Sequence, residues 1–128
     1  MKGRNAMIFD KPEYIERVKI TTDDTKTTVY KIAIGQLQAA AITVTGVVDN
    51  ADTTKSGQFL STAGFNRASG GNVAIVGNQH DIVADYTAGC AAAITIEANT
   101  TTQTVDICVT GETSETFTWK LGISCRKV

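Results

Sequence analysis

The chain has 128 residues and a mass of 13.6 kDa, which is the size of one domain. It is 42% hydrophobic and 20% charged, so it is too apolar and too weakly charged for a disordered chain. No apolar run reaches the roughly 20 residues of a membrane helix, and a net charge of -1 creates no field for nucleic acid or an anionic membrane. We therefore expect a globular domain that binds neither.

The first twelve residues show no periodicity and end at Pro12, so we expect an N-terminal arm over residues 1–12 and a single domain over residues 13–128. The arm combines cations with apolar side chains, which suits docking on another protein, because burial favours the apolar groups and pairing favours the cations. The candidate docking residues are Lys2, Arg4, Met7, Ile8, Phe9 and Tyr14.

The chain contains twenty threonines and a single proline. This composition favours strands in residues 13–128, since branched Cβ atoms suit a pleated surface. Alternating apolar and polar residues predict short strands over residues 13–20, 27–34, 40–48, 58–67, 72–77, 79–86, 92–98, 104–110 and 116–126. The polar stretch 49–57 is the longest predicted loop.

Two turns predict hairpins between these strands. Gly70 and Gly71 permit the tight turn that would join residues 58–67 to 72–77, and Gly111–Ser114 would join 104–110 to 116–126. With the turn at residues 99–102, the last three strands would form a meander. Eight or nine short strands at regular spacing predict an all-β fold, an antiparallel β-sandwich of jelly-roll type with about eight strands.

Three cysteines, Cys90, Cys108 and Cys125, cannot all pair within one chain, and none has the CxxC spacing of zinc or redox sites. Alternation places Cys125 on the core side of its strand and Cys108 on the opposite side, which argues against a bridge between them. We expect free thiols, buried or half-buried.

The residues that chemistry would require are scarce. The chain has one histidine, His80, and no G-x-S-x-G nucleophile motif, so we expect no enzymatic activity. The sequence Asp49-Asn50-Ala51-Asp52 resembles the start of a calcium loop, but Ala51 and Thr53 stand where that loop needs Asp or Asn. We predict neither a metal site nor a cofactor.

Two segments resemble a β-rich domain that recurs in virion proteins of tailed bacteriophages. The first runs from Phe65 through Arg67 and the Gly70-Gly71 turn to Gly77, and the second from Val105 to Leu121 with a single tryptophan. The resemblance covers roughly residues 57–128. It implies a non-enzymatic virion component of a fibre, spike or related surface protein, plausibly trimeric, in which the shared positions are turn glycines and core residues.

From this resemblance we expect a bacteriophage virion structural protein, assembled in the host cytoplasm. The leading hypothesis is a homotrimeric capsid decoration or head-spike subunit whose arm docks on another virion protein such as the major capsid protein. The chain contains only a dozen unpatterned residues before the first predicted strand, which favours the head over a long fibre.

Two alternatives belong to other classes. In the first, the domain is a tail-fibre or receptor-binding tip that reads a host-surface glycan with loop residues at the end of the sandwich. Its candidate ligand-binding residues are Asp49, Asn50, Asp52 and Asn99. In the second, the domain is a small enzyme that relies on His80 with Asp81 or Asp85.

Overall fold

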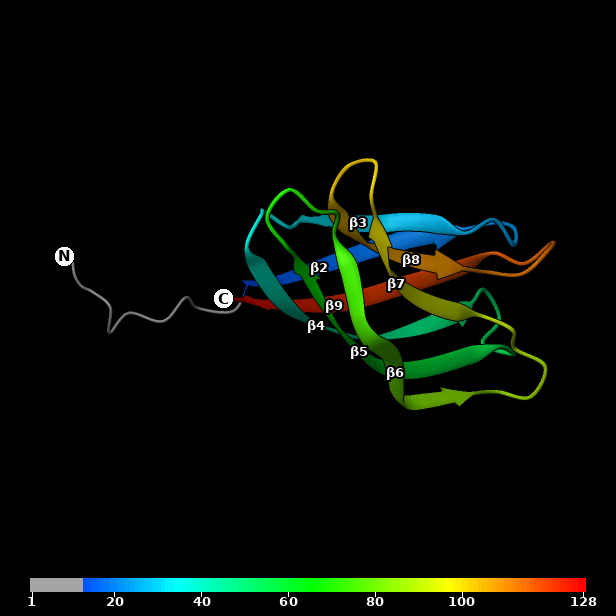
Figure 1. Ribbon diagram of the computed structural model, residues 1–128. Helices are drawn as coiled ribbons and strands as arrows, with labels where there is room; N and C mark the ends of the chain where they lie inside the picture. The colour runs from blue at the N-terminus through cyan, green and yellow to red at the C-terminus, as the bar shows by residue number, and fades with distance from the viewer. Residues whose placement is uncertain (1–12) are drawn as a thin grey trace.

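The computed structural model describes residues 13–128, which form eight antiparallel strands in two sheets (Figure 1). The strands are β2 (Glu13–Thr21), β3 (Thr27–Ala33), β4 (Gln38–Asn50), β5 (Ser56–Arg67), β6 (Ala74–Tyr86), β7 (Ala93–Asn99), β8 (Thr104–Thr110) and β9 (Phe117–Lys127). The predicted antiparallel β-sandwich is confirmed. The predicted arm, residues 1–12, lies outside the described residues.

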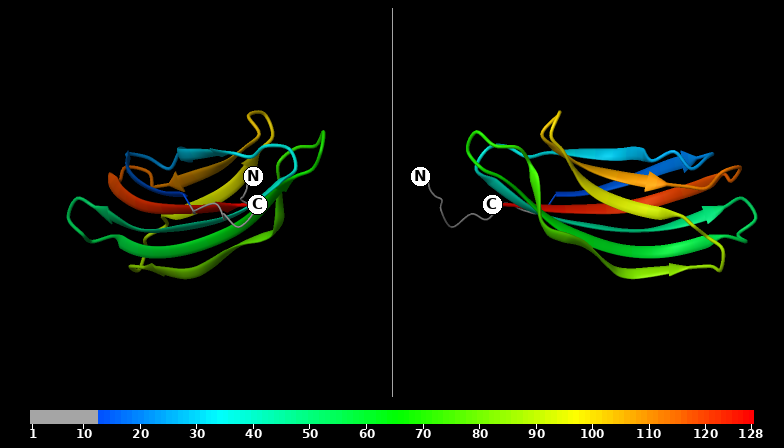
Figure 2. Two further views of the ribbon diagram at one scale, coloured as in Figure 1. Left: turned by 90° about the vertical axis from the view of Figure 1, so that its left-hand side faces the viewer. Right: turned by 45° about the vertical axis from the view of Figure 1, so that its right-hand side comes forward.

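The sandwich is unequal. One sheet has five strands in the order β2-β9-β4-β5-β6, and the other has three in the order β3-β8-β7. The views in Figure 2 show the smaller sheet covering the inner side of the larger one. Within residues 13–128 no helix is long and apolar enough to cross a bilayer.

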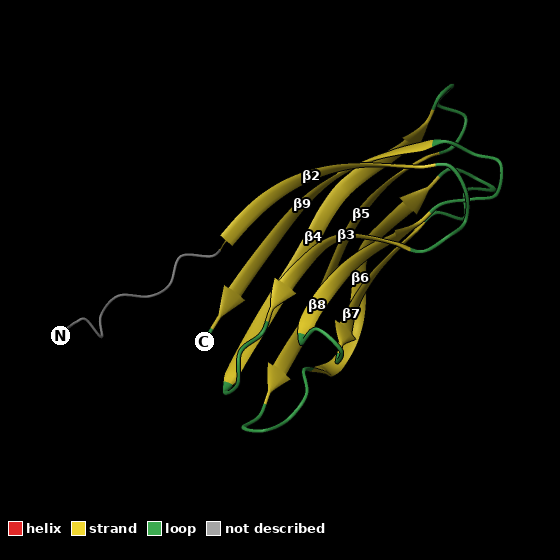
Figure 3. Cartoon of the chain, turned by 90° about the horizontal axis from the view of Figure 1, so that it is seen from above, coloured by secondary structure: helices red, strands yellow, loops and turns green. Residues whose placement is uncertain are grey.

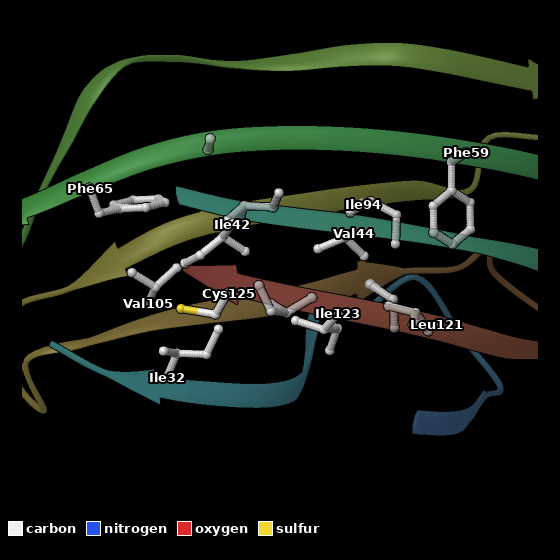
Figure 4. Close-up of a cluster of buried hydrophobic side chains, with 14 of the residues drawn as sticks. Ile32, Ile42, Val44, Phe59, Phe65, Ile94, Val105, Leu121, Ile123 and Cys125 are labelled. Carbon is white, nitrogen blue, oxygen red and sulfur yellow. The ribbon is translucent and has the colours of Figure 1, made fainter. Parts of the chain in front are cut away.

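The core lies between the two sheets and is built by period-two alternation. On β9, all five alternate residues from Phe117 to Cys125 are buried, as the sequence pattern predicts. Trp119 lies at one end of this core: its ring centroid is 6.1 Å from that of Phe59 and 6.2 Å from that of Phe117. Its indole nitrogen donates a hydrogen bond to Thr21 Oγ1 at 3.0 Å. Figure 4 shows other core side chains from both sheets pointing toward one another.

The predicted hairpin between residues 104–110 and 116–126 is wrong, although both strands exist. β8 pairs with β3 and β7 in the small sheet, whereas β9 pairs with β2 and β4 in the large one. Residues 111–116 therefore cross from one sheet to the other. Of the predicted three-stranded meander, only the β7–β8 hairpin remains, because β9 lies in the opposite sheet and is not hydrogen-bonded to β8.

A second difference concerns β6, which replaces the two predicted strands 72–77 and 79–86. Gly77 has a φ of 78°, a left-handed conformation that glycine adopts without a steric penalty, and it lies where the pairing with β5 is interrupted between Val76 and His80. Figure 1 shows that β6 is bent along its length. The register against β5 shifts at two places along the pair. Beyond Gly77, the side chain of Gln79 donates to the backbone oxygen of Ile94 at 3.1 Å and accepts from the nitrogen of Ile96 at 2.8 Å. This amide therefore ties the large sheet to β7.

The Gly70-Gly71 turn is confirmed as the connection between β5 and β6. Arg67 organises it, since its guanidinium donates to the backbone oxygen of Gly71 at 2.9 Å and to that of Ile34 at 3.1 Å. This turn lies at the same end as the β3–β4 and β7–β8 connections. The other four connections gather at the opposite end of the strands (Figure 3).

Replacing Trp119 with alanine should lower the free energy of unfolding by about 3–5 kcal/mol, because it leaves a cavity between the sheets and removes the donor to Thr21. Urea unfolding followed by circular dichroism measures this loss. Its matched control is Thr118→Ala, an exposed neighbour on the other face of β9, which should stay within about 0.5 kcal/mol of the unsubstituted protein. Equal losses for the two variants would contradict the assigned sidedness of β9.

Candidate functional site

Exposed large apolar side chains concentrate on the outer face of the five-stranded sheet. Five of them, between 47% and 62% exposed, lie on the side of the sheet that faces away from β3, β8 and β7: Tyr14, Val18, Ile20, Val47 and Val76. Tyr14, Val18 and Ile20 follow one another on β2, whereas Val47 on β4 and Val76 on β6 stand apart from them, so the face is a candidate contact surface rather than one apolar patch. We call this side of the sheet the outer face.

The centre of the outer face carries no charge. The outward residues of β4 and β5 from the Ala41–Gly64 pair to the Val47–Gln58 pair are small, hydroxylated, amide-bearing or aliphatic: Ala41, Thr43, Thr45, Val47, Gln58, Leu60, Thr62 and Gly64. Charged groups appear only toward the two sides of the sheet, for example Lys120 on β9 and Asp85 on β6. Loss of charge at the centre with polar groups around it is the composition of a protein–protein contact.

Tyr14, one of the predicted docking residues, lies on the outer face at the β2 side. Its ring crosses Gly122, where a side chain would meet Tyr14 Cζ at 3.1 Å and Thr45 Oγ1 at 3.2 Å. The tyrosine hydroxyl donates to Glu16 Oε2 at 3.3 Å. Partial removal from water, together with the negative charge of Glu16, raises the pKa of Tyr14. The other predicted docking residues, Lys2, Arg4, Met7, Ile8 and Phe9, lie outside the described residues.

The outer surface of the three-stranded sheet has the opposite character, because its polar groups are satisfied within the chain. Asp106 is only 4% exposed there. Its carboxylate accepts hydrogen bonds from Thr104 Oγ1 at 2.7 Å, Lys31 Nζ at 2.9 Å and Asn99 Nδ2 at 2.9 Å. Burial opposes the charge of Asp106, but these donors outweigh burial, so its pKa is lowered. This surface offers few free groups to a partner.

The residues proposed for glycan binding do not form one site. Asp49 and Asn50 end β4 and Asp52 lies in the β4–β5 connection that follows, whereas Asn99 ends β7 at the opposite end of the strands (Figure 3). Asn99 builds its own turn: Oδ1 accepts from the backbone nitrogens of Thr101 and Thr102 at 3.0 and 3.2 Å. Its amide nitrogen is bound to Asp106, so the side chain is committed to the fold.

Asn50 is likewise a structural residue. It is buried, and its side chain bonds the nitrogen of Lys55 at 3.1 Å and Thr54 Oγ1 at 3.0 Å. Asp52 is exposed, but Oδ1 accepts from the nitrogen and the hydroxyl of Thr54 at 3.2 and 2.7 Å, which lowers the pKa of its carboxyl group. Asp49 Oδ1 accepts from Ser56 Oγ at 3.3 Å. These hydrogen bonds shape the connection.

The same end holds an ionic cluster that sequence reasoning missed. Lys55 Nζ lies 2.6 Å from Glu112 Oε1 and 3.3 Å from Glu115 Oε2, so the β4–β5 connection is tied to the β8–β9 connection. Glu112 Oε2 also accepts from the nitrogen of Ala91 at 2.6 Å, which ties in the β6–β7 connection. No pattern in the sequence pairs residues so far apart. The cluster holds three connections together.

The three residues of the enzyme hypothesis do not form a catalytic group. His80 is exposed on the outer face opposite Thr62, and no hydrogen bond joins it to Asp81 or Asp85 among the described residues. Asp81 Oδ1 instead accepts from Ser61 Oγ at 2.7 Å and from Gln79 Nε2 at 2.9 Å. Asp85 accepts from Gln58 Nε2 at 3.1 Å. Both carboxylates support the edge of the large sheet.

The cysteines are placed as alternation predicts. Cys125 lies in the core and Cys108 on the other side of the small sheet, both buried, while Cys90 is half-buried; all three are free thiols. Burial raises the pKa of Cys108 and of Cys125. Within residues 13–128 no three His, Cys, Asp or Glu side chains gather in a way that could hold a metal ion.

No family model and no curated protein matches this chain. Among solved structures, the Acinetobacter baumannii phage AM24 tailspike protein aligns with 88% of the chain, with a TM-score of 0.47 and 9% identity. The tailspike protein gp49 of A. baumannii bacteriophage Fri1, described as a capsular polysaccharide depolymerase, aligns with 91%, with a TM-score of 0.45 and 10% identity. The chain spans only 26% and 20% of these two proteins. Similarity at this level transfers no activity.

Replacing Asp106 with asparagine should lower the free energy of unfolding by about 2 kcal/mol at pH 7, because three donors lose a charged acceptor. The folded state lowers the pKa of Asp106. The stabilisation is therefore present above the unfolded pKa of about 3.9 and is lost as the pH falls through the folded pKa.

Urea unfolding at pH 7 and at pH 3 should thus show a difference between the original protein and Asp106→Asn that shrinks at the lower pH. The exposed Asp24 supplies the control, since Asp24→Asn should change stability little at either pH. A difference of equal size at both values would show that the charge of Asp106 does not contribute.

Proposed function

We propose that this chain is a non-enzymatic structural component of a bacteriophage virion that assembles with copies of itself as a homotrimer. The observation that carries the proposal is the outer face, which exposes five large apolar side chains and carries no charge at its centre. The resemblance of residues 57–128 to a β-rich domain of virion proteins supplies the biological setting.

The character of the outer face favours a protein partner over the other classes. Nucleic acid is bound by Lys and Arg side chains that neutralise phosphates, and the central strands β4 and β5 present none of them on this face between Arg67 and Asp49. Other copies of the same chain supply similar surfaces of threonine, alanine and valine side chains. Burying such groups stabilises an assembly by roughly 25 cal/mol per Å² of apolar surface.

The absence of enzymatic activity is part of the proposal. His80 is exposed, and the neighbouring carboxylates Asp81 and Asp85 hold Ser61, Gln79 and Gln58 rather than the imidazole. General base catalysis needs a base within hydrogen-bond reach of its partner, and this arrangement does not supply one.

Two positions on the virion fit this role, and we favour the tail. A capsid decoration or head-spike subunit needs a second contact, with the capsid, in addition to the contact between copies. A domain of a tail-fibre or receptor-binding protein needs only packing of copies through the outer face. A glycan site in that setting would involve residues other than Asn50 and Asn99, whose side chains hold turns.

Immunogold electron microscopy tests the assignment to the virion and the position on it. Antibodies raised against the purified protein should label intact particles of the phage that encodes it, with gold at the end of the tail. Gold label over the capsid would instead show that the protein is a component of the head. Particles that carry the protein nowhere, checked by mass spectrometry of purified virions, would contradict the proposal.

Self-association through the outer face has its own test. Val47→Asp places a charge at the uncharged centre, where burial against another copy would be costly, so association should weaken at least about tenfold. Native mass spectrometry measures the assembly, and the melting temperature of each variant reports its fold. Ala93→Asp, at an exposed position of the small sheet, should leave the assembly intact. A monomeric original protein, or an intact Val47→Asp assembly, would overturn this role of the outer face.

A further inference from the structure

We infer that neighbouring copies meet head to tail, with the β6 side of one large sheet packed against the β2–β9 side of the next. This inference rests on the proposed self-association and adds which surfaces meet. We call β6 with its exposed side chains the β6 flank, and β2 with β9 the β2–β9 flank. They are the two opposite sides of the five-stranded sheet (Figure 1).

The charges of the two flanks are complementary. β6 carries two carboxylates, Asp81 and Asp85, and no lysine or arginine. β2 and β9 together carry five cations against two carboxylates. Arg17 lies over the ring of Tyr30 and Lys127 donates to a backbone oxygen of β3, so the cations without a partner in the described chain are Lys19, Lys120 and Arg126. Opposite potentials on two surfaces of one chain favour contact between unlike surfaces and suppress contact between like ones.

Both flanks also expose apolar side chains beside their charges. The β6 flank presents Ile75, Val76 and Ile82, while the β2–β9 flank presents Tyr14, Val18 and Ile20. In the described part of the chain, β2 and β6 each pair with a strand on one side only. Exposed edge strands with apolar side chains are surfaces that proteins ordinarily cover or protect. A neighbouring copy would cover both at once.

Each flank has an open depression that a neighbour's side chains could enter. The one on the β6 flank has a volume of about 580 Å³ and is lined by residues that include Val47, Asp85 and Tyr86. The one on the β2–β9 flank has a volume of about 380 Å³ and includes Val18 and Lys120 in its lining. Asp85 is the one charged residue in the first lining, whereas Glu16, Arg17 and Lys120 line the second, so the difference in charge between the flanks extends to these depressions.

The arrangement determines the symmetry. Contact between two β6 flanks would place Asp81 and Asp85 against a second pair of carboxylates, and contact between two β2–β9 flanks would oppose an excess of cations. A contact between unlike surfaces repeats from copy to copy and closes into a ring when the rotation allows. In a ring of three, the uncharged centres of the outer faces would turn toward a common axis.

Disulfide trapping tests the pairing directly, with one cysteine on each flank and Cys90→Ser as the background. Val18→Cys and Ile82→Cys are both highly exposed positions. Mixing the two single variants under mild oxidation should give a covalent dimer, while each alone should stay monomeric in denaturing gels. The doubly substituted chain should give covalent trimers. Dimers from either single variant, or no product from the mixture while native mass shows an assembly, would overturn the inference.

A charge exchange provides the second measurement. Asp85→Lys and Lys120→Asp should each weaken association at least about tenfold and make it less sensitive to salt, and the two together should restore most of the affinity. Circular dichroism spectra should match that of the original protein, because both side chains are exposed. Melting temperatures should fall only as far as the loss of association requires. Failure of the double variant to recover would overturn the pairing of these flanks. Immunogold labelling of the virion does not depend on these association measurements. The proposal that the protein is a virion component can therefore hold even if the pairing of the flanks is wrong.

Discussion

Burial of one face of β9 against the small sheet is the constraint on which the rest of the structure depends. Its five alternate side chains from Phe117 to Cys125 lie in the core, and Trp119 joins the aromatic rings of Phe59 and Phe117 to the hydroxyl of Thr21. Because β9 pairs with both β2 and β4, its sidedness sets which residues of those strands face inward. The composition of the outer face follows from the same alternation.

Strand positions and most inward-facing residues could be predicted from the sequence, because period-two alternation is a local property. Which strands pair with one another could not be predicted, because pairing joins residues far apart in the sequence. Residues 104–110 and 116–126 have the pattern of a hairpin, yet β8 and β9 lie in opposite sheets, since a short connection can turn back beside a strand or cross over the core. The fusion of two predicted strands into β6 depends on Gly77, whose positive φ lies where the pairing with β5 is interrupted without ending the strand.

The candidate site was less accessible to sequence reasoning. Polar loop residues such as Asn50 and Asn99 have the composition of a binding loop and of a turn alike, and only their hydrogen bonds show that they build turns. On β2, apolar side chains occupy both faces, Ile15 inward and Val18 outward, so alternation could not tell which face is exposed. The outer face becomes recognisable only when five strands are placed side by side.

Because β8 is buried on both faces, it should be the last strand to lose its hydrogen bonds when the domain fluctuates. Six of its seven residues are buried, and hydrogen bonds to β3 and β7 hold both of its backbone edges. Local fluctuations release the least buried segments first, so the amide hydrogens of β8 should exchange with solvent only through global unfolding. β6 is exposed along most of its length, so its amide hydrogens should exchange fastest among the strands. Among the strands of residues 13–128, a protease acting on an isolated copy should cleave β6 first.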